Sequence, residues 1–117
     1  MTFLHEQLSA DPLTPEQQFE HDIAIVLQTA LEHHHAGEFA EADILYQAIL
    51  DAKPDHADAN YNLGVTLIAL GSCSEAIPYL ETAQQIEPGS REVRDALKSA
   101  QHCGKGHGNG NGNGNGD

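Results

Sequence analysis

Short groups of apolar residues, separated by polar stretches, run along the chain as far as about residue 103, where a glycine-rich tail begins. Four residues bound these groups: Gly37, Pro54, Gly71 and Pro88. Glycine commonly ends a helix in the left-handed conformation, and proline cannot continue one because it lacks an N–H donor. Trp is absent and there are only three Phe and three Tyr, which favours Ala- and Leu-packed helices over a β-sandwich. The pattern predicts an all-α protein with five main helices and no β-strand.

Local capping signals set the boundaries of the predicted helices. Thr14-Pro15-Glu16-Gln17 is a capping box with proline at the first helical position, so a first helix is expected over residues 15–36. The other helices are expected over residues 38–52, 56–70, 73–87 and 91–102. Their predicted N-caps from the third helix onward are Asp55, the Ser72-Cys73-Ser74-Glu75 capping box and Ser90. Pro78 should bend the fourth helix slightly; the alternative is a helix that starts near Ile77.

The two ends of the chain differ from this helical body. Residues 1–13 are ambiguous, although their apolar side chains would allow one short helical turn that packs on the body; these are Phe3, Leu4 and Leu8. The N-terminus lacks a basic segment and a long apolar run, so no signal peptide is predicted. The longest apolar stretch, residues 23–27, is too short to span a bilayer. Residues 104–117 contain no apolar side chain and are expected to form a disordered tail or linker remnant.

The helical body repeats itself at an offset of 34 residues. Four identities define the offset: Gly37 with Gly71, Glu41 with Glu75, Ala42 with Ala76 and Pro54 with Pro88. Each unit thus has a glycine before a helix, a small alanine inside it and a proline after it. The expected organisation is an N-terminal segment, a repeat domain and a tail: residues 1–14, 15–103 (repeats 23–56 and 57–90, closing helix 91–103) and 104–117.

The second unit carries a recognisable motif. It has Asn60-x2-Leu63-Gly64-x2-Leu67, then Ala76-x3-Leu80, then Pro88, and it resembles the tetratricopeptide repeat, whose pattern is W-x2-L-G-x2-Y, A-x3-F and P. The first unit matches less well, with Thr29 and His33 at positions where Leu and Tyr are usual. The resemblance implies helix hairpins stacked as a short α-solenoid with a C-terminal capping helix. Small residues would allow close helix contacts: Ala30, Gly64, Ala42 and Ala76.

The resemblance also implies a concave groove lined by the first helix of each hairpin, in which a peptide segment of a partner binds. Carried over by position, the groove would comprise Leu27, Leu31, His34, Asp58, Tyr61, Asn62, Val65, Ile68, Glu92 and Asp95. Its centre would be apolar and its rim acidic. The alternative is that residues 1–13 or a second copy of the chain cover these apolar residues. A clamp for a C-terminal carboxylate, known in one subclass, is not expected, because only Asn62 matches that pattern.

Net charge narrows the choice of partner. The chain has 5 Lys and Arg against 18 Asp and Glu, a net charge of −13, and ten of the acids precede the first basic residue, Lys53. Such a field repels nucleic acids and anionic membranes and attracts basic partners. We therefore expect an apolar protein segment with basic flanks as the partner, although part of the charge serves solubility. Two repeats are few for a stable stack, so a homo-oligomer is also possible.

The cysteines and histidines give little support to a disulfide framework or a metal site. Cys73 and Cys103 are too few and too unpatterned for a disulfide framework or a zinc site, so free thiols and a cytoplasmic location are expected. Consecutive helical residues point about 100° apart, so His33, His34 and His35 cannot converge on one metal ion. We expect structural or solvated histidines, with His33 packed between helices, and no metal or other cofactor; a nickel or zinc carrier is the alternative.

No nucleophile motif, phosphate loop or dinucleotide fingerprint is present, so an enzyme is not expected. The most favoured function is a scaffold or adaptor that binds another protein. A weaker resemblance links residues 31–65 to the repeat segments of bacterial SPINDLY-type, O-linked N-acetylglucosamine-transferase-like proteins. It implies an alternative function, a substrate-recruiting arm associated with a glycosyltransferase-like enzyme.

Overall fold

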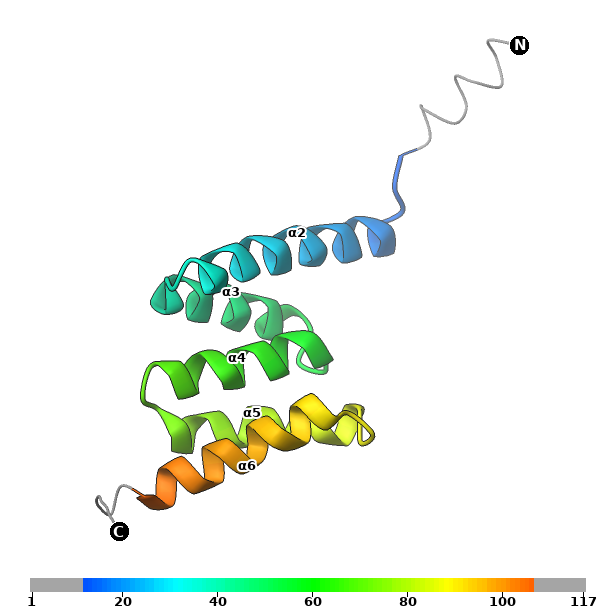
Figure 1. Ribbon diagram of the computed structural model, residues 1–117. Helices are drawn as coiled ribbons and strands as arrows, with labels where there is room; N and C mark the ends of the chain where they lie inside the picture. Colours follow the sequence, from blue (N-terminus) through cyan, green and yellow to red (C-terminus); the bar gives the residue numbers. More distant parts are fainter. Residues whose placement is uncertain (1–11, 107–117) are drawn as a thin grey trace.

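The computed structural model describes residues 12–106 and places five α-helices there. The helices are α2 (Pro15–His35), α3 (Phe39–Ala52), α4 (Ala57–Ala69), α5 (Cys73–Ile86) and α6 (Arg91–Gly106) (Figure 1). Within the described range no residue lies in a β-strand. The predicted all-α fold is therefore confirmed. The predictions for residues 1–11 and for the tail beyond residue 106 lie outside the described residues.

Most helix ends follow the predicted signals. The Thr14 hydroxyl accepts a hydrogen bond from the Gln17 amide at 3.1 Å, and the Gln17 side chain accepts one from the Thr14 amide at 3.0 Å, which completes the capping box of α2. Gly37 and Gly71 have φ angles of 81° and 84°, a left-handed conformation that ends α2 and follows α4. Pro78 lies inside α5, which remains a continuous helix.

Three predicted details of the helix ends are wrong, two in position and one in its capping bond. The N-cap of α4 is His56 and not Asp55, because the His56 ring nitrogen Nδ1 accepts the hydrogen bond from the Ala59 amide at 3.1 Å. Ser72 occupies the N-cap of α5 but makes no side-chain capping bond, so the predicted capping box is not formed. The last helix continues to Gly106, beyond the predicted end at about residue 102.

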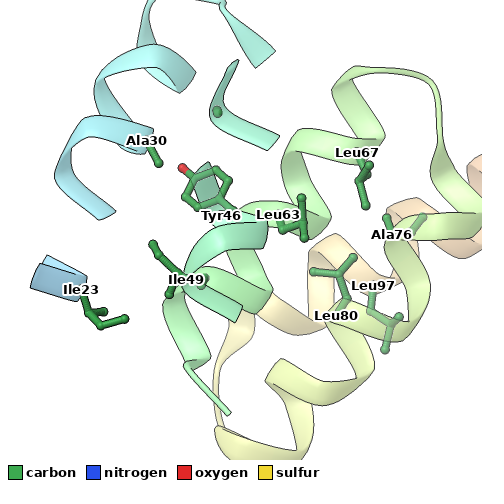
Figure 2. Packing of buried hydrophobic residues seen from close by; sticks show 12 residues of the cluster. Ile23, Ala30, Tyr46, Ile49, Leu63, Leu67, Ala76, Leu80 and Leu97 are labelled. Carbon is green, nitrogen blue, oxygen red and sulfur yellow. The ribbon is translucent and has the colours of Figure 1, made fainter. Parts of the chain in front are cut away.

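The buried core follows the 34-residue period, and Figure 2 shows two of its equivalent side chains, Tyr46 and Leu80. Equivalent positions of the two units are completely buried, namely Ala42 with Ala76 and Tyr46 with Leu80. Gly64 lies where α4 crosses α5 so closely that a Cβ atom on it would lie 2.5 Å from Leu80 Cδ2. Gly64 thus permits a close helix contact, as expected, and Leu80 fills the space beside it within the same hairpin.

The helices stack in chain order, each packed on the next, and α6 also touches α4 (Figure 1). α2 with α3 and α4 with α5 form two antiparallel hairpins. α6 closes the stack by burying Val93, Leu97 and Ala100, while its charged residues between Arg91 and Lys98 are exposed. This is the arrangement of a capping helix. None of the helices in residues 12–106 combines the length and apolar character needed to cross a membrane.

A disulfide joins Cys73 at the start of α5 to Cys103 near the end of α6, with a Cα–Cα distance of 6.0 Å. The prediction of two free thiols is therefore wrong. The two cysteines are 30 residues apart in sequence, but the antiparallel packing of α5 and α6 brings the N-terminus of one helix beside the C-terminus of the other. The bond also removes the free-thiol argument for a cytoplasmic location.

Candidate peptide-binding surface

Asp58, Tyr61 and Glu92, three of the predicted groove residues, line one pocket of about 200 Å³. Asp58 and Tyr61 come from the first turns of α4, and Glu92 comes from the first turn of α6. The pocket is completed by Glu87, Ser90 and Val93. It therefore joins side chains from two helices, α4 and α6, that are separated by α5 in the sequence.

The capping of the two helices positions the acidic side chains. Ser90 caps α6 by accepting a hydrogen bond from the Val93 amide at 3.3 Å, and its hydroxyl donates to Glu92 Oε1 at 3.3 Å. Asp58 occupies the first turn of α4 directly after the His56 cap. Carboxylates are favoured in the first turn of a helix because they interact with the positive end of the helix dipole. Local sequence thus places each acid in the first turn of its helix, where it lines the pocket.

Tyr61 lies half-buried between these carboxylates. Burial raises the pKa of the Tyr61 phenol, and the nearby Glu92 carboxylate raises it further, so the side chain is neutral near pH 7. Three carboxylates line the pocket beside the ring, those of Asp58, Glu87 and Glu92. An aromatic face with adjacent negative charge is suited to a cationic side chain such as Lys or Arg.

The remaining apolar groove residues of α2 and α4 are only partly exposed. Leu27, Leu31 and Ile68 pack against the buried cluster, and Val65 is also half-buried. The Asn62 amide donates to the Asp58 carbonyl oxygen at 2.9 Å, which ties this side chain to its own helix. The apolar residues of the predicted groove therefore also support the core.

His34 does not simply face outward as a groove residue. Its Nδ1 atom lies 3.1 Å from the Thr66 hydroxyl and 3.5 Å from the Tyr46 hydroxyl, so it links α2 to α3 and α4. Burial, with a smaller effect from His35, lowers the pKa of His34. His33 had been expected in an inter-helix packing position. Instead it is partly exposed, with its Nδ1 atom 2.6 Å from Glu38 Oε1, and His34 takes the packing role.

Sequence reasoning missed Glu87 and Ser90, which belong to the connection between α5 and α6. The repeat pattern could have indicated their place in the pocket. Because α4 and α6 run in the same direction, the segment that leads into α6 must return to the start of α4. Asp95 is exposed on α6, close to Glu92 in the sequence, but it does not line the pocket. Within residues 12–106, no group of three or more His, Cys, Asp or Glu side chains is placed to hold a metal ion.

Helix hairpins that repeat every 34 residues and close on a capping helix define an α-helical repeat protein of the interaction class. The tetratricopeptide repeat family model matches residues 33–100, more than half of the chain, and the chain belongs to this family. Its members are typically non-catalytic modules that bind other proteins, so the chain is a protein-interaction module. No curated protein matches the chain significantly. The weaker resemblance to glycosyltransferase-like proteins is thus unsupported.

Proposed function

We propose that this protein is a scaffold or adaptor that captures a peptide segment of another protein along the surface of α2, α4 and α6. The observation that carries the proposal is the Tyr61 pocket. There an aromatic ring on α4 lies beside carboxylates contributed by α4, by α6 and by the segment between α5 and α6. A peptide laid across this surface would contact both repeat units and the capping helix.

The proposed peptide combines apolar anchors with Lys or Arg. Its anchors pack on the partly exposed side chains of Leu31, Val65 and Ile68, and a basic residue enters the Tyr61 pocket. Exposed acid–base pairs contribute only about 0.2–1 kcal/mol each, so the carboxylates act mainly on association rate and salt dependence. The aromatic residue has the larger effect, about 2 kcal/mol if Tyr61 is a binding hot spot.

The test starts from a random peptide display library panned against the chain, followed by affinity measurements on the selected peptides. Selected sequences should contain an apolar residue next to Lys or Arg. The substitution Tyr61→Ala should weaken binding about 30-fold, the equivalent of about 2 kcal/mol. Tyr79→Ala is the matched control because Tyr79 is also half-buried against the core but lies on α5, away from the pocket.

Two results would reject the proposal. One is a selected set without basic residues whose binding does not change with salt. The other is equal affinity of Tyr61→Ala and Tyr79→Ala for the same peptide while both variants keep the helical circular dichroism of the parent chain.

A further inference from the structure

A second apolar cleft lies away from the Tyr61 pocket, between the N-terminal half of α2 and the C-terminal half of α3. It has a volume of about 210 Å³. Its apolar lining consists of Phe19, Ile23, Val26, Ala48, Ile49 and Ala52, and Asp22 is the one polar residue that lines it. The Phe19 side chain is 40% exposed, so a large aromatic surface faces solvent at this edge.

The repeat period explains why the cleft is open. Ile25 is 52% exposed, whereas its counterpart 34 residues later, Ala59, is completely buried beneath the preceding hairpin. Val26 is half-buried, and its counterpart Asn60 is only 3% exposed because its amide donates to the Pro54 and His56 carbonyls of the segment before α4. Within residues 12–106, no helix takes the corresponding place before α2. The first hairpin therefore exposes an edge whose equivalent in the second hairpin is covered by the preceding hairpin.

We propose that this edge is a docking site for a partner segment that inserts one aliphatic or aromatic side chain into the cleft and carries Lys or Arg beside it. A cavity of about 150 Å³ lined by apolar side chains is large enough to bind benzene, so the observed volume accepts one such side chain. The site is separate from the Tyr61 pocket and does not depend on the function proposed for it.

The charge of this edge distinguishes a basic partner from the other candidate occupants, which are a second copy of the chain and residues 1–11. Residues 15–53 contain one base, Lys53, whose Nζ atom lies 3.4 Å from Glu20 Oε2, and eight acids: Glu16, Glu20, Asp22, Glu32, Glu38, Glu41, Asp43 and Asp51. Two copies packed through this face would therefore bring like charges together. Residues 1–11 have no Lys or Arg and add two acids. A basic partner is the occupant whose charge complements the edge.

A head-to-tail contact with the basic residues of α6 from another copy lacks an anchor. α6 carries Arg91, Arg94, Lys98 and Lys105, but its large apolar residues, Val93 and Leu97, are buried against its own chain. No comparable side chain of α6 is left to enter the cleft. The partner is thus expected to be a different protein.

The experiment uses the full chain and a short fluorescent peptide of Leu and Lys in an amphipathic helical pattern, with a companion in which every Lys is Glu. Ala48→Arg places a large positive side chain at the cleft and should weaken binding of the Lys peptide at least ~10-fold. Ala40→Arg is the matched control: it makes the same charge change on an exposed position of α3 that does not line the cleft. It should alter affinity much less.

Both peptides are measured on a chain that also carries Tyr61→Ala, because a Leu and Lys peptide fits the Tyr61 pocket as well. Amide chemical shifts should then locate the Lys peptide at α2 and α3. The proposal is overturned if Ala48→Arg and Ala40→Arg weaken binding equally, or if the Glu peptide binds as well as the Lys peptide. It is also overturned if deleting residues 1–11 raises affinity several-fold, because the chain itself would then occupy the cleft. Sedimentation showing a dimer that Ala48→Arg dissociates would assign the edge to a second copy instead.

Discussion

Replacing Gly64 with alanine should destabilise the protein, although alanine is the better helix former. A Cβ atom at position 64 would lie 2.5 Å from both Cγ and Cδ2 of Leu80 and 3.1 Å from Cδ1, well inside the contact distance of about 3.5–4.0 Å for carbon atoms. Leu80 is completely buried and cannot turn toward solvent. Overpacking of this kind costs about 1–3 kcal/mol, and the gain in helix propensity offsets about 1 kcal/mol. Because the clash involves Cγ as well as the methyl end, we expect a net loss of about 1–2 kcal/mol.

Urea unfolding followed by far-ultraviolet circular dichroism measures this loss as a lower midpoint with an unchanged slope. Gly89→Ala is the control, because a Cβ atom there has no neighbour within 4 Å, and its stability should be unchanged or slightly raised. The double variant Gly64→Ala with Leu80→Ala removes the clash, so its loss should fall short of the sum of the single losses by about 0.5–3 kcal/mol. Strictly additive losses, or a stabilised Gly64→Ala variant, would refute the close contact between α4 and α5.

The remaining predictions concern the disulfide and a buried phenol. Cys103→Ser should lower stability by about 3–4 kcal/mol, because a cross-link that closes a loop of 30 residues restricts the unfolded chain; unfolding with and without a reducing agent measures this, and equal stabilities would contradict it. Burial raises the pKa of Tyr46 to about 12 from its ordinary 10.0, so the folded state favours the neutral phenol. That contribution to stability is fully present below pH 10 and should be lost as the pH rises toward about 12. A phenolate absorbance titration of the folded chain should show late ionisation of Tyr46 and Tyr61, and Tyr46→Phe should remove the step near pH 12.

The helices were predictable because their signals are local. The Thr14 capping box, the glycines at 37 and 71 and the prolines at 54 and 88 each act within a few residues of the helix end that they define. Errors arose where two neighbouring residues can do the same task. Both Asp55 and His56 can accept a capping hydrogen bond, and only the path of the chain decides between them. A shift of one residue likewise decides whether His33 or His34 faces the next helix.

The candidate site was predictable only in part because it depends on contacts between distant segments. The positions of Asp58, Tyr61 and Glu92 followed from the resemblance to the repeat family, which supplies the orientation of each helix. The place of Glu87 in the pocket and the Cys73–Cys103 bond did not follow in this way, because both depend on the antiparallel packing of α5 and α6. No spacing rule predicts a pairing across 30 residues. The partial burial of Leu27 and Leu31 could not be predicted either, because it depends on how α2 packs on the rest of the core.

The disulfide makes the molecule mechanically asymmetric. When the chain is pulled from its two ends, tension passes from residue 73 to residue 103 through the sulfur atoms and bypasses the segment between them. About 100 Å of contour length, estimated from about 3.3–3.6 Å per extended residue, then cannot be released until the bond is reduced. A partner that pulls on this protein would unravel α2, α3 and α4, while α5 and most of α6, with Glu92, remain inside a covalent ring.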